Sequence, residues 1–401
     1  MLRSRAALPD VDRVRERLRR GLTPTVSLWV GQWLTMWLAE RTDLRPATRL
    51  DYSGLIARHL LPALGDIPLE ELRPEQVRAV LAGVGAEARE IRAASQRRRA
   101  VIDTARAAWR AHDSAAARAA RQQLAALPPF RRPAGASTVQ QVRAVLRSAL
   151  SEAVRRELVT VIVAKLVRLP APPRARPLEW TPSRVAAWRK TGRRPLPVMA
   201  WTPAQTSAFL GCVAGHRLRA LFTLLAYTDC RRGEACGLHW IDVDFRRREA
   251  AVSTQLCRIG TETVEGPPKT DAGVRTLALA KVLHAALVAQ RNAQRVERRA
   301  AGVAWIDTGR VFAKPDGSEL NPAEVSDVFD RLVRDKGLPP IRLHDLKHGA
   351  ATDALDAGVP VKVVSDMLGH SSTTVTLDLY ATDTDRSRHA AADAIAHRLE
   401  G

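Results

Sequence analysis

Residues 342–380, RLHDLKHGAATDALDAGVPVKVVSDMLGHSSTTVTLDLY, hold two histidine-bearing segments and a tyrosine within a tenth of the chain. The pattern over residues 343–357 predicts a helix. On such a helix His344, Lys347 and His348 lie on one face, because side chains three and four residues apart are neighbours. Two titratable rings and a cation are therefore expected to point the same way.

A second short helix is predicted over residues 361–368. The first helix is expected to close at Gly358, and the second at Gly369, since glycine accepts the left-handed conformation that often ends a helix. This arrangement presents His370 at a helix exit. Tyr380 follows ten residues later in an amphipathic run.

Two further motifs precede this stretch, TDCRRGEACGLHWIDVD at 228–244 and PPKTDAGVRTLAL at 267–279. Together with HDLKH at 344–348, LGHSS at 368–372 and TLDLY at 376–380, they closely resemble the motifs of the tyrosine recombinases, the phage-type integrase family. The order and the spacing both match.

The resemblance implies a mainly α protein with a small antiparallel β-sheet, made of a helical core-binding domain and a tyrosine-recombinase-type catalytic domain. It implies a site-specific recombinase, or integrase, that cuts and rejoins DNA strands through a 3′-phosphotyrosyl intermediate. Neither nucleotide nor metal is required, because the energy of the phosphodiester is retained in the covalent intermediate. The implied partners are double-stranded DNA with specific recombination sites, three further protomers in a homotetramer on two duplexes, and an accessory directionality factor.

The family motifs assign roles to individual residues. Tyr380 matches the nucleophile, and Arg231 matches the first arginine of the phosphate clamp, with Glu234 as its acidic partner. A guanidinium suits this role, because its planar fork of donors can bind two phosphate oxygens at once. Lys269 matches the general acid toward the leaving 5′ oxygen. The family more often has glycine where Asp229 stands.

The histidines and Lys347 complete the expected site. His344 matches the proton acceptor near the nucleophile, and His370 the donor to a non-bridging oxygen, while His348 is expected in a supporting place. His344 and His348 could also form half of a zinc site, but no suitably spaced cysteine or carboxylate completes it, so we expect no metal. Lys347 departs from the family, which has arginine there; lysine keeps the charge but loses bidentate geometry.

The charge is uneven along the 401 residues. Residues 1–200 hold 37 basic against 17 acidic side chains, and the remainder holds 26 against 25. A basic half favours phosphate backbones, with an affinity that falls in salt. No apolar stretch of twenty residues indicates a membrane span, and we expect a cytoplasmic protein, associated with the nucleoid when bound.

The composition predicts four parts. They are a basic N-terminal arm (1–25), a helical core DNA-binding domain (26–170) with an insertion at about 85–135, a linker rich in proline and arginine (171–200), and a catalytic domain (201–401). The catalytic part is expected to contain a three-stranded antiparallel sheet between residues 244 and 280.

Local patterns give several smaller expectations. Trp29, Trp33 and Trp37 form a stripe expected to pack into a helical core. Ser137 and Thr202 are expected to cap helices. The four cysteines lack metal or disulfide spacing and are expected to be small buried groups.

Two other functions remain open. A catalytically impaired, site-specific DNA-binding protein would keep the fold and lose the chemistry, as Lys347 could indicate. A type IB-like topoisomerase would share the chemistry but need no partner site. Trapping of a covalent adduct separates the first from a recombinase, and a paired-site recombination assay separates the second.

Overall fold

The computed structural model describes most of the chain, in the ranges 28–131, 133–170, 177–268, 273–346, 354–355 and 357–367 and at positions 373, 393, 396 and 398. The chain divides into two compact units between Pro173 and Arg174. The described part is mainly helical with small antiparallel sheets, as the sequence predicts. The N-terminal arm expected at 1–25 lies outside the described residues.

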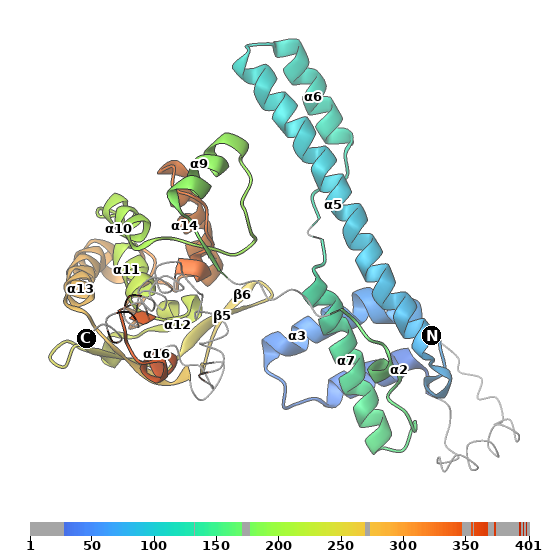
Figure 1. The fold of residues 1–401 in the computed structure, drawn as a ribbon. Helices are drawn as coiled ribbons and strands as arrows, with labels where there is room; N and C mark the ends of the chain where they lie inside the picture. Colours follow the sequence, from blue (N-terminus) through green and yellow to red (C-terminus); the bar gives the residue numbers. More distant parts are fainter. Residues whose placement is uncertain are drawn as a thin grey trace, which may run out of the picture. The chain divides into compact units, whose positions relative to one another are not determined.

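The regular elements among the described residues of the first unit are all helices (Figure 1). Its elements are α2 (Val30–Glu40), α3 (Pro46–Leu55), a π-helical turn (Ile56–Leu60), α4 (Leu61–Leu64), a 3-10 turn (Leu69–Glu71), α5 (Pro74–Arg110), α6 (Ser114–Ala126), α7 (Ala136–Arg155) and α8 (Val163–Leu166).

Tryptophan side chains from α2 are central to the core of this unit. Trp33 and Trp37 are each 1% exposed, and Trp33 Nε1 donates to the carbonyl oxygen of Ala149 at 3.0 Å. Trp37 stacks on Tyr52 with ring centroids 6.1 Å apart. The predicted core stripe is therefore confirmed for these two residues, whereas Trp29 is 45% exposed because it lies before the helix begins.

Proline changes the helix that follows without ending it. The sequence pattern predicts a helix that ends at Pro62 and Gly65, and the helical chain runs through a π-helical turn into α4, with Gly65 as its C-cap. Proline has no N–H and clashes with the carbonyl four residues earlier. A π turn, which accommodates an extra residue, removes that clash.

The predicted helical insertion is a helical hairpin. α5 runs well beyond α2, α3 and α7, and α6 folds back alongside it (Figure 1). The next helix, α7, has Gly135 as its N-cap, so the expected cap at Ser137 is wrong by two residues. Apolar side chains at 142, 145, 146, 149, 150 and 153 form its buried face, whereas Val139 is only partly buried.

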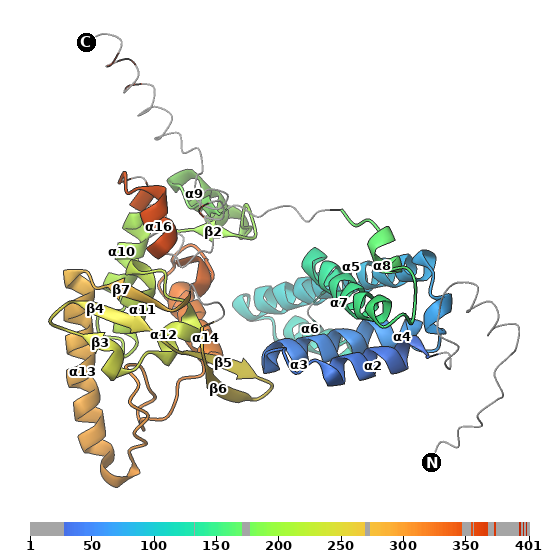
Figure 2. The same ribbon diagram turned by 90° about the horizontal axis from the view of Figure 1, so that it is seen from below.

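The second unit combines helices with small sheets (Figure 2). In order they are β1 (Leu178–Glu179), α9 (Pro182–Thr191), β2 (Met199–Ala200), α10 (Pro203–Cys212), α11 (Arg219–Tyr227), α12 (Arg232–Gly237), a 3-10 turn (Trp240–Asp242), β3 (Val243–Asp244), β4 (Glu249–Val252), β5 (Gln255–Ile259), β6 (Glu262–Gly266), β7 (Arg275–Ala278), α13 (Lys281–Ala301), a 3-10 turn (Gly302–Ala304), α14 (Pro322–Asp335), a 3-10 turn η6 (Leu343–Asp345) and α16 (Val361–Met367).

The expected three-stranded antiparallel sheet is present in a different arrangement. Its order is β3-β4-β7, with Val243 opposite Ala250 and Ala250 opposite Leu277. β5 and β6 form a separate hairpin, with Cys257 opposite Val264. The chain therefore leaves the sheet after β4 and returns to it at β7.

Residues 177–200 are structured within the second unit, although composition assigns them to a linker. β1 pairs in parallel with β2, and α9 lies between them. Trp180 is fully buried, and its Nε1 donates to the carbonyl oxygen of Pro340 at 3.3 Å. An aromatic side chain in a proline-rich stretch thus anchors this segment to the core of the second unit.

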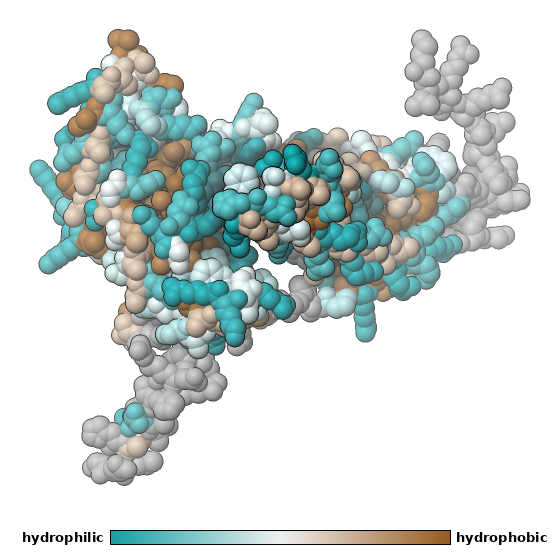
Figure 3. Space-filling model, turned by 90° about the horizontal axis from the view of Figure 1, so that it is seen from above, coloured by the Kyte–Doolittle hydropathy of each residue, from teal (hydrophilic) through white to brown (hydrophobic). Residues whose placement is uncertain are grey.

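Other local predictions have mixed outcomes. Thr202 caps α10, accepting a hydrogen bond from Gln205 N at 3.2 Å, and Gly358 has a positive φ of 79°, as its role in ending a helix requires. Cys230 and Cys236 are buried, but Cys212 is exposed and Cys257 half-buried, so the expectation of four buried thiols is half wrong. Hydrophilic side chains predominate on the face shown in Figure 3.

Candidate functional site

Arg231 is the N-cap of α12, and Glu234 in the first turn holds it in two ways. The Arg231 backbone N–H donates to Glu234 Oε2 at 2.9 Å, and Arg231 Nη1 donates to Glu234 Oε1 at 2.8 Å. An arginine side chain cannot accept the helix N–H groups, so the acid three residues on reaches back to the cap. The Arg231 side chain is fixed yet 30% exposed.

A second guanidinium, that of Arg275 at the start of β7, holds Glu234 from the other side. Arg275 Nη2 donates to Glu234 Oε2 at 3.0 Å and to the carbonyl oxygen of Asp229 at 3.0 Å. It also lies 3.9 Å from Asp229 Oδ2, and Nη1 donates to the carbonyl oxygen of Gly273 at 3.0 Å. Arg275 therefore ties the loop before α12 to the strand that follows the Lys269 turn.

Sequence reasoning missed Arg275. The only available signal was its place six residues after Lys269, on the strand that closes the same motif. Its partners are 41 and 46 residues away along the chain, so no local pattern reveals the contact. The same contact accounts for Asp229, which is 4% exposed and adds a second carboxylate beside Arg275.

Two positive and two negative side chains thus make an almost neutral cluster. Burial acts to raise the pKa of Glu234, but the charge of Arg275 and the hydrogen bonds from Arg231 outweigh it and hold that pKa below its ordinary value. Burial also acts to lower the pKa of Arg231, and its hydrogen bond and charge interaction with Glu234 raise it instead. Both groups are therefore ionised at neutral pH.

The cysteines beside this cluster are not nucleophiles. Burial raises the pKa of Cys230 well above its ordinary value, and burial raises the pKa of Cys236 to about 12. A thiol needs to ionise near neutral pH to react. Their role is packing, as the sequence suggests.

Two glycines let α12 approach β5 closely. A Cβ on Gly233 would lie 2.7 Å from the carbonyl oxygen of Leu256, and one on Gly237 would lie 2.7 Å from Gln255 Cα. These positions are four residues apart and so lie on one face of the helix. The backbone of the β5–β6 hairpin therefore sets the position of the Arg231 turn.

His344 lies on the 3-10 turn η6, and its side chain is exposed. The turn is fixed by Arg342 and Asp345, with Arg342 Nε to Asp345 Oδ2 at 2.8 Å and Nη2 to Oδ1 at 2.6 Å. Asp345 is 1% exposed. A 3-10 turn therefore occupies the start of the predicted helix, whose residues 347–353 lie outside the described part of the chain. α14 packs against both this turn and α12.

Five of the expected site residues lie outside the described part of the chain. They are Lys269, Lys347, His348, His370 and Tyr380. Among the described positions, the structure joins Arg231 directly to Glu234 and places His344 in the same unit. Within the same positions no group of three or more metal-binding side chains is gathered, and no helix combines the length and hydropathy needed to cross a bilayer.

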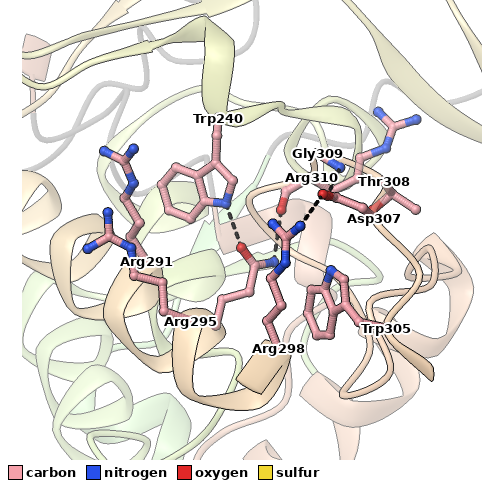
Figure 4. Close-up of a pocket in the computed structure, with 10 residues that line it drawn as sticks. Trp240, Arg291, Arg295, Arg298, Trp305, Asp307, Thr308, Gly309 and Arg310 are labelled. Atoms are coloured by element: carbon pink, nitrogen blue, oxygen red, sulfur yellow. Dashed lines mark hydrogen bonds and ion pairs between the residues drawn. The ribbon is translucent and has the colours of Figure 1, made fainter. Parts of the chain in front are cut away.

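A cavity of about 210 Å³ in the second unit is not lined by Arg231, Glu234 or His344 (Figure 4). Gln294 of α13 crosses it, accepting from Trp240 Nε1 at 2.6 Å and donating to the carbonyl oxygen of Arg310 at 2.9 Å. Arg298 pairs with Asp307 at 2.9 Å. These bonds hold the loop before Arg310 against α13. The polar side chains around the cavity therefore have a structural role.

Two family models match the sequence. The phage integrase family matches residues 204–387, and the N-terminal SAM-like domain of phage integrases matches residues 30–82. The first range contains Arg231, His344 and Tyr380. The second covers α2 to the first part of α5.

Relatives with these names share part of the chain. A tyrosine recombinase XerC-like protein of Caldanaerobacter subterraneus is 33% identical over 178 residues, which are 41% of this chain and 46% of that protein. The ICEBs1 integrase of Bacillus subtilis is 26% identical, over 45% of this chain and 49% of that protein. The chain thus spans about half the length of these relatives. The integrase of Mycobacterium phage D29 is 24% identical over 86% of this chain and 72% of that protein.

Solved structures share the fold. The Tn1549 transposon integrase in complex with transposon right end DNA is 19% identical, covers 92% of this chain and 100% of that one, and gives a TM-score of 0.61. A lambda integrase dimer bound to a COC′ core site is 17% identical. That match covers 92% of this chain and 81% of the lambda integrase chain, with a TM-score of 0.53. These similarities confirm the expected fold class.

Proposed function

We propose, because this chain belongs to the phage integrase family, that it cuts and rejoins DNA strands at specific sites through a covalent tyrosine intermediate. The Tyr380 hydroxyl attacks a phosphodiester, forming a 3′-phosphotyrosyl bond and releasing a 5′ hydroxyl. The 5′ hydroxyl of a partner strand then attacks that phosphotyrosine, restoring the phosphodiester and freeing the tyrosine. Bonds broken and formed balance, so the reaction consumes no nucleotide.

The observation that carries this proposal is the state of the Arg231 guanidinium. One of its nitrogens, Nη1, is held by Glu234, while Nε and Nη2 have no partner among the described residues. A fixed, charged fork with two remaining donor nitrogens suits the non-bridging oxygens of a phosphate. Such a preorganised group costs no rearrangement as charge develops in the transition state.

The remaining roles follow from the family motifs. Lys269 donates a proton to the leaving 5′ oxygen, and His344 accepts the Tyr380 proton as the bond to phosphorus forms. His370 donates to a non-bridging oxygen, and Lys347 contributes the second positive charge of the clamp. His348 supports this constellation.

The partners are also part of the proposal. Lambda integrase has been solved as a tetramer bound to a Holliday junction, with a TM-score of 0.51 to this chain. By analogy four copies of this chain would act on two duplexes. An accessory factor that sets the direction of recombination is a further expected partner.

Replacement of Tyr380 by phenylalanine gives the direct test. On a nicked duplex that traps the covalent intermediate, we expect wild type to form an adduct and Tyr380→Phe to form none. Duplex binding should change little, because one hydroxyl is lost among many phosphate contacts. The readouts are a denaturing gel for the adduct and fluorescence anisotropy for binding.

The outcomes separate the alternatives. An adduct at wild-type level in Tyr380→Phe would exclude this residue as the nucleophile. Wild type that binds DNA but forms no adduct would favour the catalytically impaired DNA-binding protein. An adduct together with supercoil relaxation, but without recombination of paired sites, would favour the type IB-like topoisomerase.

A further inference from the structure

The far part of the α5–α6 hairpin has no evident role in the first unit's core. We call residues 89–126 the hairpin arm. The core of the unit reaches α5 only near its start, through Val77 and Leu81. Beyond Ala88 the two helices bury little except alanines, of which Ala108, Ala117 and Ala120 are at most 9% exposed. The SAM-like family model ends at residue 82, before the arm begins.

Hydrogen bonds nevertheless stabilise the hairpin arm. Asp113 caps α6, accepting from Ala115 N at 3.1 Å and Ala116 N at 2.9 Å. Arg98 crosses from α5 to donate to the carbonyl oxygens of Leu124 and Pro128 at 3.4 and 3.3 Å. At about 1.5 Å per residue, the 37-residue α5 is roughly 55 Å long. The arm is thus an ordered extension with a large solvated surface.

That surface is strongly basic, with nine arginines and three acids between residues 89 and 126. Arg92, Arg99, Arg106 and Arg110 recur at intervals of seven, seven and four residues, which places them along one side of α5. All four are exposed.

Several of these charges have no partner within the part of the chain that the structure describes. Among the described residues, Arg99, Arg110, Arg118 and Arg121 are exposed and make no hydrogen bond or ion pair. Arg106, by contrast, lies 3.7 Å from Asp103. Unpaired guanidiniums on both helices leave the arm with an uncompensated positive field.

An exposed aromatic ring lies among them. Trp109 is 69% exposed, and it lines an open groove of about 480 Å³ between α5 and α6 together with Arg106, Arg110 and Arg121. A row of arginines along one helix is the electrostatic footprint of a nucleic-acid-binding surface.

We propose that the hairpin arm is a second DNA-contacting element, whose arginines bind phosphates of duplex DNA in addition to the contacts of the SAM-like fold. The inference rests on the proposed function, because it takes duplex DNA as the partner. Nucleic acid fits the arm better than a protein surface does, since a polyanion neutralises a row of arginines by releasing its own counterions.

The test replaces the four unpaired arginines by glutamine in the full chain, as R99Q/R110Q/R118Q/R121Q. The probe is a fluorescein-labelled duplex of about 60 base pairs, long enough to span several helical turns, and its anisotropy is followed across a series of NaCl concentrations. Each lost phosphate contact should lower the slope of log Kd against log salt by about 0.9, so by up to about 3.6 in all. Binding at 150 mM NaCl should weaken roughly 10-fold to 1000-fold.

Two matched variants control for net charge and for folding. R189Q/R246Q/R295Q/R299Q removes four exposed arginines of the second unit and should change the slope much less. R99K/R110K/R118K/R121K keeps the charges and should keep most of the slope. Circular dichroism and thermal melts should be alike for all variants, because none of the four arm residues bonds to another described residue.

The outcomes that overturn the proposal are distinct from a failure of the proposed function. An unchanged slope in the arm variant, an equal loss in the second-unit control, or lost self-association with unchanged DNA affinity would each reject the arm as a DNA contact. The arm variant keeps every proposed catalytic residue, so a wild type that forms no adduct on the nicked duplex counts against the recombinase alone.

Discussion

The carboxylate of Glu234 has no solvent exposure and lies between two guanidiniums, those of Arg231 and Arg275. Arg231 faces outward, while the Arg275 side chain is 8% exposed and makes three hydrogen bonds to protein oxygens. The two arginines therefore have different roles. Arg275 is a positioning residue, and its charge lets Glu234 remain ionised while Glu234 aims Arg231.

Removal of Arg275 should leave a buried carboxylate without its main counter-charge. We expect Arg275→Ala to lower the free energy of unfolding by about 3 to 5 kcal/mol at pH 8. A carboxyl group whose pKa is depressed on folding stabilises the protein above its unfolded pKa, and that stability is lost as pH falls. In the variant the Glu234 pKa should rise, so the deficit should be smaller at pH 5. Urea denaturation at both pH values measures it.

Two comparisons keep this prediction specific. Arg275→Lys retains a charge but not three hydrogen bonds at once, so its deficit should be intermediate. Arg295→Ala removes an exposed arginine of the same unit and should cost little at either pH. A deficit in Arg275→Ala that is the same at pH 5 and pH 8 would show that lost packing, and not the charge of Glu234, is the cause.

For single residues, the sequence predicts contacts between neighbours in the chain and misses contacts between distant residues. The contact of Arg231 with Glu234 spans one helical turn, so the motif alone predicts it. Arg275 meets the same carboxylate only because β7 returns beside the loop before α12. No periodic pattern in the residues between them predicts this contact.

Between the elements, the decisive contact is that of α12 with β5. Gly233 and Gly237 present no side chain to the strand, so the two backbones meet. α12 has only six residues, and a helix so short depends on its neighbours for its position. The packing of α12 against β5 therefore determines the orientation of Arg231.

We expect Gly233→Ala to separate α12 from β5. The added Cβ would lie 2.7 Å from the carbonyl oxygen of Leu256, a contact that backbone must move to relieve. Overpacking of this kind costs about 1 to 3 kcal/mol. Adduct formation on the nicked duplex should fall by more than the loss of stability explains at 25 °C, since the Arg231 turn shifts with the helix.

Gly211 supplies the matched control. It lies in α10 of the same unit, and a Cβ there would meet no atom within 4 Å. Gly211→Ala should therefore raise stability by up to about 1 kcal/mol and leave adduct formation unchanged. If Gly233→Ala behaved like Gly211→Ala in both assays, close approach of β5 would not be what positions Arg231.

Elements with strong local chemistry are predicted well, and the others are not. Thr202 caps α10 and Gly358 takes a positive φ, because each role depends on one residue type. The cap of α7 was misassigned because Ser137 has the better side chain, yet the helix begins two residues earlier at the glycine. The separation of β5 and β6 from the sheet depends on tertiary contacts that alternation cannot reveal.

For the whole molecule, the boundary between the units changes the distribution of charge. Residues 1–173 hold 30 basic and 16 acidic side chains, and residues 174–401 hold 33 and 26. Seven of the basic residues assigned to a linker thus belong to the second unit. Both units carry an excess of positive charge, so both are suited to a polyanion.

The last prediction tests this boundary with two fragments, 174–401 and 201–401. The shorter fragment loses Trp180 and Met199, which are at most 1% exposed, and the β1–β2 pairing. Loss of a buried tryptophan side chain alone costs about 3 to 5 kcal/mol. Fragment 174–401 should therefore unfold cooperatively in urea at a higher midpoint, whereas 201–401 should be less stable by at least about 3 kcal/mol.

A point variant separates this effect from that of shortening the chain. Trp180→Ala in fragment 174–401 should lower stability nearly as much as deletion of residues 174–200, because the indole fills the core and bonds to Pro340. Trp188 on α9 is only partly buried, so Trp188→Ala should cost less. Equal midpoints for 174–401 and 201–401 would mean that residues 174–200 are a linker after all, as their composition suggests.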